Sequence, residues 1–263
     1  MLRFMEIAEA QYQRIASSLP RQRGNVKLNN LQLLNALLYV AEHGCKWRGL
    51  PKRFGNWHTI YTRMNRWSKS SVLDQVFEQL QREQIVRVRI ESVSLDSTTV
   101  KVHPDGTGAL KNGPQAIGKS RGGWTTKIHM VAANARTAIT FALSPGQASD
   151  AVEGRKLLGG IGPLPAPLHL VMDGAYEDNQ TLQLALDFGF IPVVPPRPNR
   201  LEPWEYDRAM YRRRNEIERL FRRLKGFRRI FSRFDKLDVV FLAFLYFALI
   251  VEALRYLNSV NTP

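Results

Sequence analysis

The chain has little cysteine and few acidic residues for its length. Among its 263 residues there is one cysteine, Cys45, so no disulfide can form within the chain and no zinc site has enough sulfur ligands. Acidic residues number 23 against 38 lysines and arginines, which gives a net charge of +15. An excess of this size indicates a polyanionic partner, either nucleic acid or an anionic membrane surface.

Long apolar segments are also missing. The N-terminal sequence MLRFMEIAEAQYQR lacks the apolar core of a signal peptide. The longest apolar run, residues 239–251, has 13 residues, which is too short to span a bilayer and is typical of a buried helix. We therefore expect a soluble cytoplasmic protein.

The positive charge is unevenly distributed. Residues 1–90 hold 15 basic and 6 acidic side chains, residues 91–200 hold 10 and 9, and residues 201–263 hold 13 and 8. The middle is nearly neutral and both ends are basic, so the sequence predicts two separate surfaces for a polyanion.

The first ninety residues have the pattern of helices. Residues 28–44 show a helical apolar period that ends at Gly44, a residue suited to a helix C-cap. A short helix around Pro51–Phe54, a turn at Gly55 and a longer helix from Trp57 to Ser68 would form a helix-turn-helix, although an ordinary three-helix unit with a basic face fits as well. The longer helix presents side chains able to reach DNA: Trp57, His58, Thr59, Thr62, Arg63, Asn65 and Arg66.

From Glu91 onward, strands alternate with helices. Three strand-like runs, SVSLDSTTVKVH, WTTKIHMVAAN and TAITFALSPG, precede a buried run, LHLVM, that stops at Asp173. A helix capped by Asp178 and Gly189 and a fifth strand, FIPVV, follow. This order predicts an α/β fold with a mixed five-stranded sheet flanked by helices. The glycine- and lysine-rich loop from His103 to Gly123 is long for a hairpin, and such loops are either functional or disordered.

Three acidic positions could carry chemistry. A carboxylate inside an apolar strand, as at Asp96, is costly unless it is paired or binds a cation. Asp173 stands at the carboxyl end of a strand, where ligands bind in open α/β sheets. With a glutamate from the arginine-rich helix, these oxygens would suit Mg²⁺ or Mn²⁺, and two such ions would clamp a phosphodiester during displacement. Each acid could equally be a turn residue or an ion-pair partner.

The arginine-rich segment YRRRNEIERLFRRLKGFRRIFSRFDK, residues 211–236, holds two glutamates close together. At about 100° per residue, Ile217, Leu220 and Phe221 form its buried stripe. Glu216 and Glu218 fall on opposite sides of this stripe, so helix geometry leaves both open as metal ligands.

Three segments of the chain resemble DDE-type transposases of bacterial insertion sequences, specifically insertion-sequence family five of the IS4/IS5-like superfamily. They are LDSTTVKVHPDGTGALKNGPQAIGKSRGGWTTKIHM, VMDGAY and the arginine-rich segment. The family signature on the last helix is Tyr, two residues, Arg, three residues, Glu, six residues, Lys. Tyr211, Arg214, Glu218 and Lys225 fit every spacing, whereas Glu216 does not. GCKWRGLPKRFGNWHTIYTRMNRWSK also looks like the family's helical DNA-binding region.

The resemblance implies a fold, a site and a division of the chain. The sheet would be ribonuclease-H-like, with Asp96, Asp173 and Glu218 as catalytic residues that hold two Mg²⁺ or Mn²⁺ ions. Residues 1–90 would be a small helix-turn-helix domain, and residues 91–263 the catalytic domain without an insertion domain. DNA contacts are expected from Tyr211, Arg214, Arg222, Lys225, Lys119 and Arg121, and in the N-terminal domain from Trp57, His58, Thr62, Arg63 and Arg66.

The implied activity is transposition in the bacterial cytoplasm, associated with the nucleoid. The protein would bind the terminal inverted repeats of its element, cleave the ends and join the freed 3′-hydroxyl to target DNA, acting as a dimer or larger assembly. The apolar helix at residues 239–251 is a possible dimer interface, although we favour packing on the sheet of its own chain. A transposase-derived repressor and a nuclease that cuts without joining are the alternatives.

Overall fold

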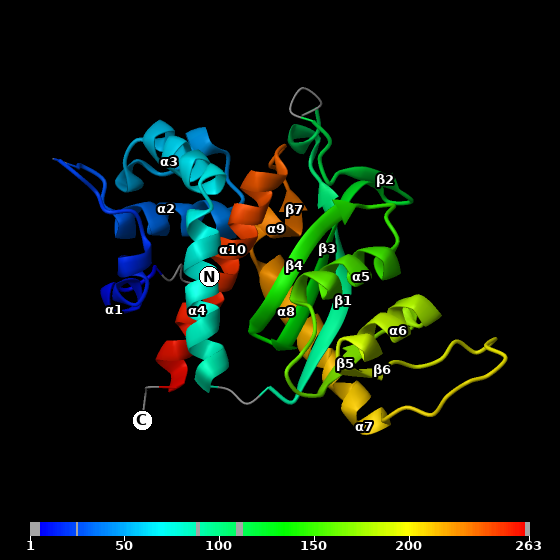
Figure 1. Cartoon of the computed structure of the whole chain (residues 1–263). Coiled ribbons are helices and arrows are strands. Elements are labelled where there is room, and N and C mark those ends of the chain that lie inside the picture. The colour runs from blue at the N-terminus through cyan, green and yellow to red at the C-terminus, as the bar shows by residue number, and fades with distance from the viewer. Residues whose placement is uncertain (1–5, 25, 88–89, 109–112, 261–263) are drawn as a thin grey trace. The chain divides into compact units, whose positions relative to one another are not determined.

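A computed structural model describes residues 6–24, 26–87, 90–108 and 113–260 of the chain. The chain divides into two compact units, whose elements are labelled in Figure 1. The helical unit comprises the residues up to Gln84, the segment His103–Pro114 and the residues from Leu224 onward. The sheet unit comprises Ile85–Val102 and Gln115–Arg223. Within the described part of the chain, no helix has the length and apolarity needed to cross a membrane.

The helical unit joins both ends of the sequence. It consists of α1 (Glu9–Gln13), α2 (Asn30–His43), α3 (Trp57–Lys69), α4 (Val72–Arg87), α9 (Arg228–Phe231), the two-residue β7 (Ser232–Arg233) and α10 (Asp238–Val260). Helix α10 packs against α1, α3 and α9. We had expected this apolar helix to lie on the sheet, but it forms part of the core of the helical unit. Residues at both ends of the sequence thus belong to one compact unit.

Local sequence signals explain the α2–α3 segment. Asn29 caps α2 by accepting from the Gln32 N–H at 2.7 Å. Gly44 ends α2 with a φ of +64°, and a Cβ there would meet the Cβ of Arg228 at 2.9 Å, so glycine is required. The short helix expected near Pro51 is a 3₁₀ turn, Lys52–Phe54, and α3 begins where predicted.

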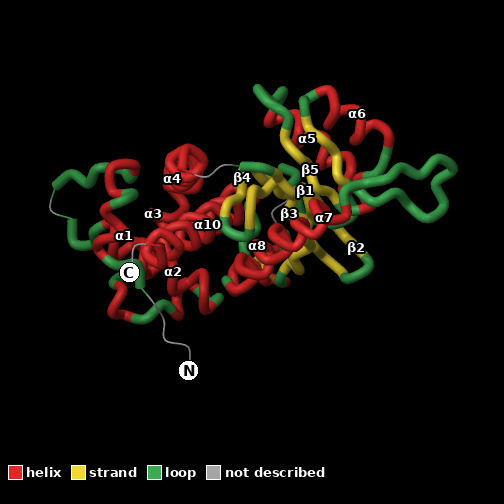
Figure 2. The backbone as a smooth tube through the Cα atoms, turned by 90° about the horizontal axis from the view of Figure 1, so that it is seen from below, coloured by secondary structure: helices red, strands yellow, loops and turns green. Residues whose placement is uncertain are grey.

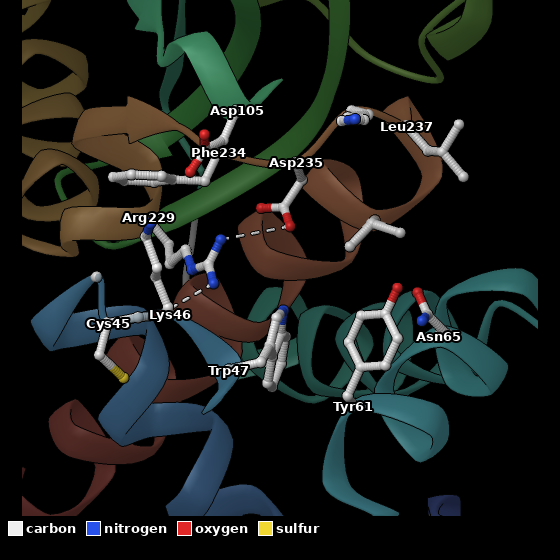
Figure 3. A pocket seen from close by; sticks show the side chains of 13 residues that line it. Cys45, Lys46, Trp47, Tyr61, Asn65, Asp105, Arg229, Phe234, Asp235 and Leu237 are labelled. Atoms are coloured by element: carbon white, nitrogen blue, oxygen red, sulfur yellow. Dashed lines mark hydrogen bonds and ion pairs between the residues drawn. The ribbon is translucent and has the colours of Figure 1, made fainter. Parts of the chain in front are cut away.

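A buried arginine helps tie α9 to the α2–α3 segment. Figure 3 shows the Arg229 guanidinium directed toward Asp235 and the backbone of Cys45. Its Nη1 lies 3.6 Å from Asp235 Oδ1, and its Nη2 donates to the Cys45 carbonyl oxygen at 3.2 Å. The guanidinium also lies over the rings of Trp47 and Phe234, at 5.5 and 5.2 Å from their centroids. Burial raises the pKa of Asp235, and the charge of Arg229 opposes this rise.

The sheet unit has the predicted mixed sheet. Its elements are β1 (Ser92–Val102), β2 (Gly118–Ser120), β3 (Gly123–Asn134), β4 (Thr137–Pro145), α5 (Asp150–Ile161), β5 (Leu168–Met172), α6 (Asn179–Asp187), β6 (Phe190–Val193), α7 (Arg208–Tyr211) and α8 (Asn215–Gly226), which runs into the helical unit. The long strands lie in the order β4-β3-β1-β5-β6. Strand β3 is antiparallel to β1 and β4, whereas β1, β5 and β6 are parallel. This is the mixed five-stranded sheet that the sequence predicts, with the short β2 added beside β3.

Helices cover both faces of the sheet. Figures 1 and 2 show α5 and α6 on one face and α8 on the other. Val93 and Leu95 of β1 pack with Leu157 and Leu158 of α5 in the buried core. Because side chains alternate along a strand, the neighbouring residue Asp96 faces the α8 side.

Helix α5 was not anticipated from the sequence. It contains Gly154, Gly159 and Gly160, which lower helix propensity. Gly154 has a structural reason, because a Cβ there would meet the Tyr176 ring at 2.6 Å and Leu95 Cδ2 at 3.1 Å. The glycine lets α5 approach β1, the strand that carries Asp96.

Candidate active site

Strand register brings the first two acids together. Strands β1 and β5 are parallel neighbours in which Leu95 pairs with Met172. Asp96 and Asp173 are the next residues on each strand, so their side chains lie side by side on the face opposite α5. Asp96 lies within β1 and is 8% exposed, whereas Asp173 follows the last residue of β5.

One guanidinium connects these two acids with a third. Arg214 Nη2 lies 3.7 Å from Asp96 Oδ2 and 3.8 Å from Asp173 Oδ2. Arg214 Nη1 donates to Glu218 Oε1 in an i,i+4 ion pair at the start of α8. The three acids predicted to act together therefore surround one cation, although 45 residues separate Asp173 from Glu218.

Backbone donors fix the two aspartates. Asp96 Oδ1 accepts from the Ser97 N–H at 2.7 Å, and Asp173 Oδ1 accepts from the Ala175 N–H at 2.6 Å. Burial raises the pKa of Asp96 to about 6, a rise that the Ser97 bond and the Arg214 charge oppose. The charges of Asp173 and Glu218 raise it further. This carboxylate is therefore poorly solvated and surrounded by other negative charge.

The electrostatics of Arg214 match its position among the acids. Burial lowers the pKa of Arg214, but the charges of Asp96, Tyr211, Glu218 and Asp173 more than offset this, so the pKa is raised overall. Its Nε is buried and has no hydrogen-bond partner among the described residues. Arg214 is half-buried, and its buried Nε remains an unpaired donor beside three carboxylates, a donor that a phosphate oxygen could accept from.

The two glutamates of α8 have different partners. Glu218 contacts Arg214 and so belongs to the acidic cluster. Glu216 Oε2 accepts from the Ala135 N–H at 3.0 Å in the turn between β3 and β4, and Glu216 Oε1 lies 3.4 Å from Arg219. Contacts therefore distinguish the two glutamates: Glu216 binds a turn, whereas Glu218 pairs with the guanidinium that also lies near the two aspartates.

The acids fit a divalent cation by their chemistry. Three carboxylates are the hard oxygen donors that Mg²⁺ and Mn²⁺ prefer. Among the described residues, however, no group of three or more histidine, cysteine, aspartate or glutamate side chains is arranged to hold a metal ion. The cation that the acids contact in this arrangement is the guanidinium of Arg214.

The other signature residues lie near the acids or on the same helix. Tyr211 ends α7, and burial raises its pKa, an effect increased by the charges of Asp173 and Asp96. Lys225 lies seven residues after Glu218 on α8, and burial lowers its pKa. Arg222 is exposed and donates weakly to Asn215 Oδ1 at 3.4 Å.

The predicted DNA-binding residues of α3 fall into two groups. His58, Thr62 and Arg66 are exposed, as expected for side chains that reach a ligand. Trp57 is half-buried, and the guanidinium carbon of Arg48 lies over its indole ring, 5.6 Å from the ring centroid. Arg63 instead makes internal hydrogen bonds, to the Leu28 carbonyl oxygen at 2.8 Å and to Asn30 Oδ1 at 2.5 Å.

The loop residues predicted to touch DNA lie on the β2–β3 hairpin. Lys119 is in β2 and Arg121 is in the turn that follows, and both are exposed. Trp124, paired with Lys119, is 52% exposed and was not singled out from the sequence. Lys111, at the start of this loop, lies outside the described residues. No contact of Lys119 or Arg121 with the acidic cluster is seen in the described part of the chain.

His103 and His129 both make contacts within the protein. His129 is fully buried, and its Nε2 lies 2.7 Å from Ser144 Oγ. Burial lowers the pKa of His129 and favours its neutral form. His103 Nδ1 accepts from the Asp105 N–H at 3.1 Å, and its ring stacks on Phe234.

A polar cluster that sequence reasoning missed supports β1 beside Asp96. Asp150, at the start of α5, accepts from Ser97 Oγ at 2.8 Å and pairs with Lys127 at 3.0 Å. These residues come from three elements far apart in sequence, so no local pattern could reveal them. They join the strand that carries Asp96 to α5 and β3.

Comparison with protein families assigns both parts of the chain. Residues 7–77 match the family described as "Putative transposase of IS4/5 family", and residues 89–251 match "Transposase DDE domain". The chain is 33% identical over 108 residues to "Uncharacterized protein y4sN" of Sinorhizobium fredii, covering 40% of this chain and 83% of that protein. It is 28% identical over 132 residues to "Putative transposase for insertion sequence element IS6501" of Brucella ovis, covering 50% of this chain and 99% of that protein.

Two solved structures show weaker similarity. A piggyBac transposase synaptic complex with hairpin DNA matches 78% of this chain and 51% of its own, with a TM-score of 0.41 and 10% identity. The Mos1 transposase paired-end complex with left transposon end matches 70% of this chain and 65% of its own, with a TM-score of 0.26 and 10% identity. The family matches together span most of the chain, and they establish that this protein belongs to the DDE transposases of the IS4/IS5 family.

Proposed function

We propose that the protein binds the terminal inverted repeats of an insertion sequence, cleaves the element ends and joins the freed 3′-hydroxyl to target DNA. The observation that carries this proposal is the contact of one guanidinium, that of Arg214, with Asp96, Asp173 and Glu218. A DNA-binding repressor would not need two sheet carboxylates and one helix carboxylate around a single guanidinium, where their mutual repulsion is costly.

Asp96, Asp173 and Glu218 would together hold two Mg²⁺ or Mn²⁺ ions. When bound, such ions lower the pKa of a water nucleophile and stabilise charge on the phosphodiester oxygens. The buried carboxylate of Asp96 and the partly exposed ones of Asp173 and Glu218 would set where the ions sit. Water and the 3′-hydroxyl are the two nucleophiles, so no side chain needs to form a covalent bond with DNA.

Arg214 would act as a replaceable cation. It offsets part of the negative charge of the acids in the protein alone, and the arrival of divalent charge would weaken its hold on them. The guanidinium could then turn to a DNA phosphate, which it would bind in a bidentate manner. Tyr211, Arg222 and Lys225 would position the same DNA strand from α7 and α8.

The helical unit would supply sequence recognition. His58, Thr62 and Arg66 on the exposed side of α3, together with Trp57 at its start, would contact base edges and phosphates of the terminal repeat. Lys119 and Arg121 on the β2–β3 hairpin would add DNA contacts from the sheet unit. Since transposition processes two ends together, the active form would be a dimer or larger assembly on DNA.

A single reaction separates this function from its rivals. The purified protein is incubated with a labelled duplex carrying its own element ends, an acceptor plasmid and Mg²⁺ or Mn²⁺, beside Asp173→Asn as control. End-specific nicks and joined products in the wild type alone would support transposition. Nicks without joining would indicate a nuclease, and end binding without cleavage in either metal would indicate a repressor.

A further inference from the structure

A groove in the helical unit is lined by five cationic side chains and no acidic one. Its volume is about 1020 Å³, and its walls are one side of α3, from Asn56 to Ser70, and the segments Pro20–Arg23 and Val26–Leu28. The lining cations are Arg21, Arg23, Lys27, Arg63 and Arg66. Like charges this close repel one another, so a groove of this composition is stabilised by an anionic occupant.

The segments that form one wall are held in place by neutral hydrogen bonds. Asn30 Nδ2 donates to the Pro20 carbonyl oxygen at 3.2 Å, and Gln22 Nε2 donates to the Leu28 carbonyl oxygen at 2.9 Å. These two bonds bring residue 20 close to α2 and residue 22 close to residue 28. The wall is therefore positioned without the use of its own charges.

Arg63 connects this wall to α3. Its two terminal nitrogens donate to Leu28 and Asn30, and its guanidinium lies over the Trp67 ring, 5.5 Å from the centroid. Burial lowers the pKa of Arg63, and the nearby charge of Arg66 lowers it further. Arg63 thus acts as a structural link, and both of its terminal nitrogens donate within the protein.

The other four cations are available to a ligand. Arg21, Arg23, Lys27 and Arg66 are exposed, and none of them forms an ion pair with an acid in the described part of the chain. Thr59, Asn56 and Ser70 add neutral hydrogen-bonding groups to the same groove. Cations with interspersed hydroxyl and amide groups are the combination that proteins use for phosphate oxygens.

We propose that this groove binds one sugar–phosphate strand of duplex DNA beside the segment that α3 contacts. The loop cations Arg21, Arg23 and Lys27 would face the phosphates from one wall, and Arg66 from the other. These contacts read no bases, so the groove contributes affinity and register, while sequence preference comes from the exposed side of α3. This inference rests on the proposed function, because it assumes that the partner is the DNA of the element.

The test compares two variants of the full-length protein with equal loss of charge. The groove variant is Arg23→Gln with Lys27→Gln. The control is Arg82→Gln with Lys156→Gln, whose side chains are 81% and 67% exposed and pair with Glu78 and Glu153 outside the groove. Binding to an end duplex and to a scrambled duplex is measured by fluorescence anisotropy over a range of salt concentrations.

The groove variant should lower the slope of log K against log salt by about 1.8, since each lost phosphate contact removes about 0.9. Its preference for the end duplex over the scrambled duplex should stay within about twofold of wild type, since phosphate contacts carry little sequence information. The control should leave slope and preference near those of wild type. A groove variant whose salt slope and preference match those of the control would overturn the inference.

The wild-type arm separates failure of the groove from failure of the function. If the wild type neither prefers nor cleaves the end duplex, the proposed function fails, whatever the groove variant shows. If the wild type binds and cleaves the end duplex and the groove variant keeps the wild-type salt slope, only the groove assignment fails. Thermal melting of both variants excludes misfolding as the cause of lost binding.

Discussion

Removing the charge of Asp96 should stabilise the protein in the absence of metal. Burial raises the pKa of this carboxyl from 3.8 to about 6, a difference of about two units. One unit corresponds to about 1.36 kcal/mol, so an ionised Asp96 destabilises the fold by about 3 kcal/mol at pH 8. Asp96→Asn keeps an oxygen that can accept from Ser97 N–H, and Arg214 keeps Asp173 and Glu218 as partners.

The sign of the pH dependence follows from the direction of the shift. The pKa of Asp96 is raised in the folded state. The stability that its protonated form contributes to the fold is therefore fully present below about pH 4 and is lost as the pH rises through 6. The gain in unfolding free energy of Asp96→Asn over wild type should therefore be largest at pH 8, about half as large at pH 5, and absent near pH 3.5.

Urea unfolding in EDTA at these pH values, followed by tryptophan fluorescence, measures the effect. At pH 8 the midpoint of Asp96→Asn should rise by about 1 M or more. An unchanged or lower midpoint at pH 8 would refute the electrostatic reasoning. An equal rise at every pH would show that the gain comes from packing.

Three further substitutions test other parts of the account. Glu218→Gln should abolish end cleavage, while its affinity for the end duplex in a gel shift stays within about threefold of wild type. Glu216→Gln should still cleave. The reverse result would make Glu216 the third acid. Arg214→Ala should bind Mn²⁺ several-fold more tightly in calorimetry yet bind end DNA more weakly, because it removes a competing cation and a phosphate partner; weaker Mn²⁺ binding would mean that Arg214 organises the acids. Gly154→Ala should lower the unfolding free energy by about 1–3 kcal/mol, because its Cβ would overlap the Tyr176 ring; an unchanged urea midpoint would show that α5 can shift away from β1.

Features that depend on short stretches of sequence could be predicted. The strands of the sheet were visible as apolar runs, and the caps at Asp178 and Gly44 as single residues. The positions of Asp96 and Asp173 followed from a carboxylate within a strand and one at a strand end. Such signals lie within a few residues of the element that they define, so one sequence is sufficient to find them.

Features that depend on distant partners could not be predicted. Helix periodicity alone could not separate Glu216 from Glu218, because the partner of Glu216 is a backbone N–H 81 residues away. Arg63 was predicted to contact DNA, but its partners Leu28 and Asn30 lie more than thirty residues earlier and give it a structural role. The glycines of α5 weakened its helical pattern, and only the close approach of Gly154 to Tyr176 explains one of them.

The placement of the C-terminal helix has the same cause. An apolar run of 13 residues indicates burial but does not specify which surface buries it. In the structure, Tyr246 of α10 packs its ring against Phe77 of α4, 5.4 Å between centroids, and Gln11 of α1 donates to the Leu254 carbonyl oxygen at 3.2 Å. These contacts join the two ends of the sequence in one core.

The most direct test of the central claim is the binding of Mn²⁺ to the complex with end DNA, measured by electron paramagnetic resonance. If Asp96, Asp173 and Glu218 form one divalent metal site, then Asp96→Asn, Asp173→Asn and Glu218→Gln should each lose at least one of the ions that the wild type binds. Glu216→Gln should bind the wild-type number. Wild-type Mn²⁺ binding in all three acid variants would contradict the assignment of the active site.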